Sequence, residues 1–211
     1  MVLMVSLQML VFLATLLTAI PTIVLAAYMT KKWIGKKQRS HLFWSAGLWL
    51  FAITVLMETL FSQGIYSSLL IDLYLLLVVI LVEMLALGSI QLIKSKLYRD
   101  LYYAFTVIIT AITAYLIFSK DQGNLIMNYV VAGQPSIPVI IASSVATFAA
   151  VIIIVFIAAI SYRKTHNAKM ISIITGVCIV SIAGTLYIAS YPYLLYYSEF
   201  IGMALLWLGF V

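Results

Sequence analysis

The carboxyl side chains inside hydrophobic segments are the residues of this sequence best suited to chemistry. Glu83 lies within an apolar run at 68–93, and no basic residue lies within two helical turns of it. An ionised carboxylate is costly in lipid, so Glu83 must be protonated, paired with another helix, or reached by water, and such a group can take up a proton or coordinate a cation. The alternative is a structural role, as a neutral acid bonded to a backbone carbonyl or to a threonine. The candidate threonines are Thr15, Thr54 and Thr147.

Three further acids lie toward one side of the predicted membrane segments. Asp72 precedes Glu83 by eleven residues, which is close to three helical turns, so both acids share a helix face and lie about 16 Å apart. Glu58 and Glu199 lie near the ends of their own apolar runs, on the same side as Asp72. The three acids predict a tyrosine-rich entrance that attracts cations or a polar solute. For Asp72 the alternative is stabilisation of a helix end, because an anion in the first turn is favoured by the free amides there.

Motifs typical of enzymes are absent from the sequence. His41 and His166 both fall in short basic joints, and the one cysteine, Cys178, lies in an apolar run. This arrangement offers no HExxH motif, no cysteine cluster and no histidine pair within the bilayer, and no nucleophile motif or phosphate-binding glycine loop is visible. The sequence therefore predicts no metal, no cofactor and no catalytic residue, and favours a role other than catalysis.

The composition is that of an integral membrane protein. Of 211 residues, 65% are apolar and 9% are charged, and the mean hydropathy is +1.19; an ordinary soluble domain has about 25% charged residues. The net charge of +6 does not indicate a nucleic-acid partner, because the basic residues lie in short joints between apolar runs. The runs do not alternate as barrel strands do, so the predicted fold is all-α.

Seven apolar runs are long enough to cross a bilayer as helices. Eleven of the twelve Lys and Arg residues lie in the joints 31–41, 94–99 and 162–169. The positive-inside rule then predicts a multi-pass protein of the cell membrane, with its amino terminus outside and its carboxyl terminus in the cytoplasm. The predicted helices are 6–30, 42–62, 68–93, 100–118, 138–161, 170–190 and 193–211.

An internal repeat is the clearest sign of how the helices are organised. Residues 14–32 align without gaps on residues 146–164, and the third and seventh helices both end in a Leu-Gly pair. Both triplets begin outside and end inside, so a parallel 3+1+3 plan is predicted, in which the fourth helix returns the chain across the membrane. The predicted units are a first three-helix bundle at 1–93, a linking helix 4 with an outer loop at 94–137, and a second bundle at 138–211.

Small residues recur at four-residue spacing in the two aligned helices. Such stripes let helix backbones approach closely in lipid, so both are predicted to face neighbouring helices. The stripes are Ala14, Thr18, Thr22 and Ala26 in one helix and Ala142, Ala146, Ala150 and Ala158 in the other.

The 3+1+3 plan resembles that of the SWEET and PQ-loop carriers over the whole chain and, more distantly, that of heptahelical rhodopsins. The proline-glutamine pair that names the PQ-loop family is missing, and the nearest string, Gln134-Pro135, is reversed and lies in an outer joint. No lysine lies within 193–211 to form a retinal Schiff base, which argues against retinal chemistry. The resemblance is one of architecture, and it implies a carrier.

The leading hypothesis is a carrier of a small solute or cation, coupled through an intramembrane carboxylate, with Glu83 as the first candidate. Its rival is a receptor or an accessory subunit that does not transport, with a membrane protein or a second copy of the chain as its partner. A lipid-modifying enzyme is a lesser alternative. A water-filled path that reaches Glu83 between the two triplets would favour the carrier, and a dry interior would favour the subunit.

Overall fold

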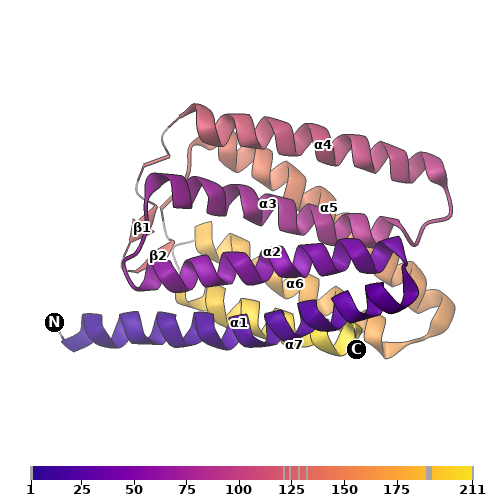
Figure 1. Ribbon diagram of the computed structural model, residues 1–211, viewed down its shortest axis with the longest axis horizontal. Helices are drawn as coiled ribbons and strands as arrows, with labels where there is room; N and C mark the ends of the chain where they lie inside the picture. The colour runs from indigo at the N-terminus through magenta and orange to yellow at the C-terminus, as the bar shows by residue number, and fades with distance from the viewer. Residues whose placement is uncertain are drawn as a thin grey trace.

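The computed structural model describes residues 2–120, 122–123, 125–127, 129–131, 133–188 and 192–210, and most of them lie in seven helices (Figure 1). The helices fall where the sequence predicts them, and α1 and α5 extend further into the basic joints than expected. Their bounds are α1 (Val2–Lys36), α2 (Arg39–Ser62), α3 (Ser68–Ile90), α4 (Lys96–Ser119), α5 (Ile137–Thr165), α6 (Ala168–Ile188) and α7 (Pro192–Phe210).

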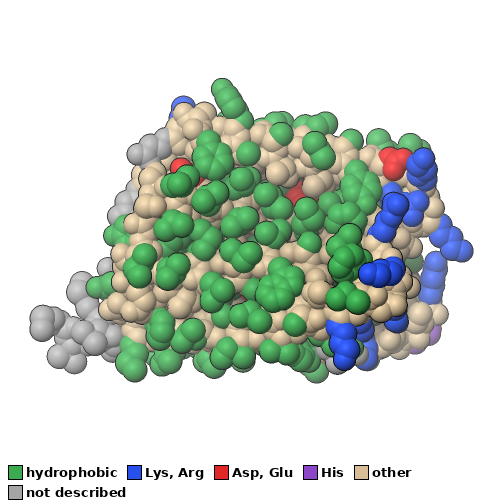
Figure 2. All heavy atoms as spheres, viewed as in Figure 1, with side chains coloured by type: hydrophobic (Ala, Val, Ile, Leu, Met, Phe, Trp, Pro, Cys, Tyr) green, Lys and Arg blue, Asp and Glu red, His purple; other side chains and the backbone are tan. Residues whose placement is uncertain are grey.

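Five helices in the described part of the chain are long and apolar enough to cross a membrane: α1, α2, α3, α4 and α5. A shorter apolar stretch, Ala168–Val180, lies in α6. Large apolar side chains cover the face of the molecule in Figure 2. Leu17, Tyr115 and Phe148 are among the exposed apolar residues. A soluble protein does not expose apolar surface on this scale, so the chain is a multi-pass membrane protein.

The helices form a closed ring in the order of the sequence. α1 packs against α2, α2 against α3, α3 against α5, α5 against α6, α6 against α7, and α7 returns to α1. α4 packs against α3 and α5 and lies at the edge of the molecule in Figure 1. The ring therefore consists of six helices, and the seventh, α4, covers the seam between α3 and α5.

The two stripes of small residues face the interior of the protein. Every member of both stripes is buried, and Thr18, Thr22, Ala26 and Ala150 are fully enclosed. The prediction that these stripes contact neighbouring helices is thus confirmed.

The buried threonines of α1 satisfy their hydroxyl groups on their own helix. The hydroxyl of Thr15 donates to the carbonyl of Phe12 at 3.0 Å, and that of Thr18 donates to the carbonyl of Ala14 at 3.0 Å. Thr22 does the same toward Thr18 at 2.7 Å. The interior face of α1 therefore includes three threonines among apolar residues, and their hydroxyls need no partner on another helix.

Glycines allow α2 to approach α3, and α6 to approach α7, at corresponding points. A Cβ atom at Gly47 would lie 3.1 Å from the carbonyl oxygen of Leu81. A Cβ atom at Gly176 would lie 3.0 Å from the carbonyl oxygen of Gly202. In both hairpins the second helix thus brings its backbone against a glycine of the first.

A second pair of glycines extends this correspondence. A Cβ atom at Gly88 would lie 2.3 Å from Cδ1 of Trp44, and one at Gly209 would lie 2.4 Å from Cγ1 of Ile173. In the first hairpin, Gly88 lies seven residues after Leu81, and Trp44 lies three residues before Gly47. In the second hairpin, Gly209 lies seven residues after Gly202, and Ile173 lies three residues before Gly176. The two hairpins therefore share one register of close contacts.

The basic residues gather at one end of the molecule, at the right in Figure 2, which we call the basic end. At the opposite end two short strands, β1 (Ile126–Met127) and β2 (Val130–Val131), form an antiparallel hairpin that the sequence analysis did not predict. Tyr129 makes the turn with a positive φ of 67°. The hairpin packs with Met57 and Phe61 of α2 and Tyr74 of α3, so it covers the end of the ring that we call the hairpin end.

Candidate functional site

Glu58 and Tyr74 form a buried hydrogen bond near the hairpin end. Glu58 lies one turn before the end of α2 and is 3% exposed. The hydroxyl of Tyr74, on α3, donates to Oε1 of Glu58 at 2.6 Å. A hydroxyl-carboxyl bond of this length is strong, and it fixes the position of one of the two carboxyl oxygens.

Glu199 of α7 lies within electrostatic range of Glu58 and Tyr74. α2 and α7 are separated around the ring by α1, so the two carboxyl groups meet inside the ring rather than on its surface. Oε2 of Glu58 and Oε2 of Glu199 are buried, and neither has a hydrogen-bond partner among the described residues. The pair is therefore a site with unused acceptor capacity, and it is suited to hold a proton or a cation.

Glu83 lies at a different place, between α3 and α4. The hydroxyls of Tyr102 and Thr106, both on α4, donate to its Oε2 at 2.7 Å and 2.9 Å, and Glu83 is fully buried. Its Oε1 is buried without a hydrogen-bond partner in the part of the chain that the structure describes. The structural alternative in the sequence analysis was a neutral Glu83 bonded to a backbone carbonyl or to a threonine such as Thr15, Thr54 or Thr147; the threonine that bonds to it is Thr106 of α4.

Asp72 does not lie where a simple helix-end role would require. It is half-buried in the second turn of α3, just beyond the first turn in which the sequence analysis placed it. Ser67 caps this helix instead, because its side chain accepts a hydrogen bond from the backbone N–H of Leu70 at 3.3 Å. Of the four acids singled out from the sequence, the structure thus brings together Glu58 and Glu199.

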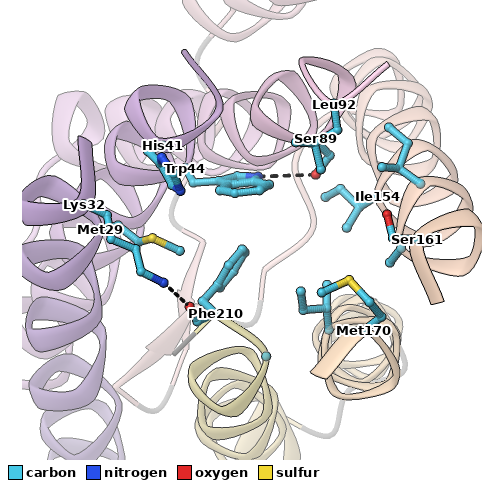
Figure 3. Close-up of a pocket in the computed structure, with 14 residues that line it drawn as sticks. Met29, Lys32, His41, Trp44, Ser89, Leu92, Ile154, Ser161, Met170 and Phe210 are labelled. Atoms are coloured by element: carbon cyan, nitrogen blue, oxygen red, sulfur yellow. Dashed lines mark hydrogen bonds between the residues drawn. The ribbon is translucent and has the colours of Figure 1, made fainter. Parts of the chain in front are cut away.

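A cavity of about 190 Å³ opens near the basic end, among six helices (Figure 3). Every helix of the ring contributes to its lining, and α4 does not. The described lining does not include Glu83, so the cavity does not extend to that carboxyl group. The polar lining residues are Lys32, His41, Trp44, Ser89 and Ser161.

Several residues that line the cavity occupy positions that the predicted repeat would pair. The alignment of 14–32 on 146–164 pairs one lining residue of α1 with one of α5. The glycine contacts that the two hairpins share pair two lining residues of α2 with two of α6. The residues that directly follow the paired glycines of α3 and α7 give a fourth pair. The pairs are Met29 with Ser161, His41 with Met170, Trp44 with Ile173, and Ser89 with Phe210.

His41 lies in a different environment from the one expected. The sequence analysis placed both histidines in short basic joints, where a solvated side chain is the expectation. His166 is indeed exposed, at the end of α5. His41, however, lies inside the first turn of α2, is 9% exposed, and has a buried Nδ1 without a hydrogen-bond partner among the described residues. It belongs to the cavity because α2 begins three residues earlier than predicted.

Sequence reasoning missed the hydroxyl partners of the acids and the polar lining of the cavity. Tyr74 and Tyr102 lie in long apolar runs, where an aromatic residue carries no signal of its own. Of the polar lining residues, Lys32 was visible in the sequence as the last residue of the first aligned segment.

Among the described residues, no group of three or more His, Cys, Asp or Glu side chains could hold a metal ion. Comparisons of the chain with family models, with curated proteins and with solved structures found no match.

Proposed function

We propose that this chain is a carrier of a small solute, whose path runs inside the six-helix ring between the first and the second helical triplet. The observation that carries the proposal is the cavity at the basic end, because both triplets line it at positions that the predicted repeat would pair. In carriers built from repeats, the substrate site lies at the interface between the two repeats.

A parallel 3+1+3 repeat and an outside amino terminus are part of this proposal. The repeat is supported by the shared register of glycine contacts in the α2–α3 and α6–α7 hairpins. The orientation is supported by the positive-inside rule, since the lysines and arginines gather at one end (Figure 2). In this orientation the cavity faces the cytoplasm, and the β-hairpin lies on the outer side of the membrane.

We place the coupling group at the carboxyl pair of Glu58 and Glu199. Two carboxyl groups close together in a medium of low polarity cannot both ionise without a large cost, so the pair retains a proton or binds a cation. The pair lies inside the ring, whereas Glu83 faces α4 at its edge. The carboxyl pair is therefore better situated than Glu83 to respond to a solute in the path.

The path is tested by uptake into proteoliposomes with a variant that fills the cavity. Ser161→Trp should abolish uptake, because Ser161 lines the cavity. Phe156→Trp on the same helix is the matched control, since Phe156 is 59% exposed on the lipid-facing side. Equal uptake by both variants would contradict a path through the cavity.

The coupling group is tested by the effect of a pH gradient on the same uptake. Glu58→Gln and Glu199→Gln should each remove the stimulation by the gradient, while Glu83→Gln should retain it. The opposite result would return the coupling role to Glu83.

A receptor or accessory subunit that does not transport is the second candidate. It is favoured by the enclosure of Glu83 and Glu58, which leaves both carboxyl groups without contact with solvent. Absence of uptake for every solute in a broad screen, by a protein that is folded in the liposomes, would support this alternative.

A further inference from the structure

The cavity at the basic end has basic side chains on one side, together with Met29, and mainly apolar side chains on the other, together with Ser161 (Figure 3). Figure 3 shows Lys32 and His41 on one side, and Ile154 and Met170 on the other. A ligand that fits both walls must itself have a polar end and an apolar end.

Lys32 supplies a positive charge with donors to spare. Its Nζ donates to the carbonyl oxygen of Phe210 at 2.7 Å and lies 4.6 Å from the centre of the Tyr28 ring. An ammonium group has three N–H donors, so two remain after the bond to Phe210. Its hydrogen bond to the backbone holds the charge at the cavity without neutralising it.

His41 adds a second group that needs a partner. Its Nδ1 is buried, and no described residue bonds to it. Nδ1 is a donor in the imidazolium and in one of the two neutral tautomers, so it can bond to an anion in either state. The ring is held edge-on by Trp44, whose ring centre lies 5.8 Å away.

The charge around the cavity selects an anion over a cation. None of the described residues that line the cavity is acidic. The exposed Lys31, Lys36 and Lys37 lie on the same end of the molecule and add to the positive potential there. A positive mouth raises the local concentration of anions and repels cations.

The volume sets the size of the ligand. The cavity of about 190 Å³ corresponds to roughly six water molecules. It is smaller than the roughly 300–1,000 Å³ of sites for drug-sized ligands. An anion with a short hydrocarbon tail fits these dimensions.

We propose that this cavity binds a short-chain monocarboxylate, whose carboxylate bonds to Lys32 and His41 and whose tail lies against Ile154 and Met170. This assignment deepens the proposed function and rests on it, since it names the solute class that enters the path. The carboxylate takes the free donors, and the apolar tail displaces water from the opposite wall.

The probe for this site is hexanoate, titrated by calorimetry into the purified full-length protein in nanodiscs. Hexanoate should bind saturably. Hexanol and hexylammonium, which have the same tail without the anion, should bind at least about tenfold more weakly. Equal affinity for hexanol and hexanoate would overturn the assignment, because the charged side of the cavity would then contribute nothing.

Variants of the polar wall test which residues hold the carboxylate. Lys32→Gln and His41→Leu should each weaken hexanoate binding about tenfold. Lys31→Gln is the matched control, because it removes the same charge from an exposed position adjacent in sequence, and screening should limit its effect on binding to less than about twofold. Lys32→Arg keeps the charge and the bond to Phe210 and should retain binding, which separates loss of the ligand from loss of the fold. Parent-like binding by both Lys32→Gln and His41→Leu would overturn the assignment.

Binding is measured without a gradient across a membrane, so the binding experiment and the uptake experiment can fail independently of each other. Hexanoate binding without uptake of any solute would overturn the carrier and leave the ligand assignment standing. Uptake of a neutral or cationic solute by a protein that does not bind hexanoate would overturn the ligand assignment and leave the carrier standing.

Discussion

Glu83 is held by two hydroxyl donors on a single oxygen. Tyr102 and Thr106 both donate to Oε2, and they lie one helical turn apart on α4. An acid that keeps its proton on the other oxygen can satisfy both donors and remain neutral. In this arrangement the carboxyl group joins α4 to the ring, and its contribution is to stability.

Replacement of Glu83 by Gln should therefore leave stability almost unchanged, because the amide oxygen can accept both hydrogen bonds. Glu83→Ala should lower the free energy of unfolding by roughly 2–4 kcal/mol, since two buried hydroxyls lose their acceptor and a cavity remains. Reversible unfolding of both variants in mixed micelles measures the difference. Strong destabilisation by Glu83→Gln would instead indicate an ionised carboxylate with a buried positive partner.

The positions of the buried acids could be predicted from the sequence, but their partners could not. A carboxyl group in an apolar run is visible because it is costly in lipid. The hydroxyls of Tyr74, Tyr102 and Thr106 are chosen by the packing of separate helices, and nothing in the sequence distinguishes them from other tyrosines and threonines. The burial of His41 depends on where α2 begins, and helix ends are the least certain part of a sequence-based prediction.

The α2–α3 and α6–α7 hairpins depend on glycine at their points of closest approach. A side chain at these points must push the helices apart, and Gly209, together with the contacted Trp44 and Ile173, also lines the cavity. Gly88 and Gly209 are thus required by the neighbouring helix and not by backbone conformation, since neither has a positive φ.

Gly88→Ala should lower the free energy of unfolding by roughly 1–3 kcal/mol, because its Cβ would overlap the Trp44 ring. Gly35→Ala, in α1, is the matched control: nothing lies within 4 Å of a Cβ there, and alanine favours a helix. The control should be neutral or slightly stabilising. If Gly88→Ala unfolds as the parent does, the close contact between α2 and α3 is wrong.

Among the secondary-structure elements, the long helices could be predicted from the sequence, and the β-hairpin could not. Runs of about 20 apolar residues predict a spanning helix with little ambiguity. Each strand of the hairpin has only two residues, which is too short for an alternating pattern to emerge. Its position is fixed by contacts of Leu125, Ile126 and Val131 with α2 and α3, and these contacts are distant in the sequence.

The whole molecule has two chemically different ends and an apolar wall between them. This asymmetry fixes how the protein can lie in a bilayer, because the basic end and the hairpin end must both reach water. It also decides which positions can report on orientation. Gln122 is a poor reporter, because it is buried and its Oε1 accepts from the backbone N–H of Ser136 at 3.0 Å.

Single cysteines placed in a protein that lacks Cys178 should reveal the orientation. Cysteines at Ser67 and Gln134, both exposed at the hairpin end, should react with an impermeant maleimide in intact cells. A cysteine at Gln38, exposed at the basic end, should react only after permeabilisation. The reverse pattern would place the cavity on the outside and invert the proposed direction of the path.

The self-bonded threonines of α1 bear on the order in which the molecule is made. α1 is synthesised before its partner α7, so it lies in the membrane while the helices between them are still being made. Because Thr15, Thr18 and Thr22 bond to carbonyls of their own helix, that face can meet lipid during this time without exposing unsatisfied hydroxyls. The closure of the ring can thus be the final step of assembly, and α1 need not be protected by another protein before α7 arrives.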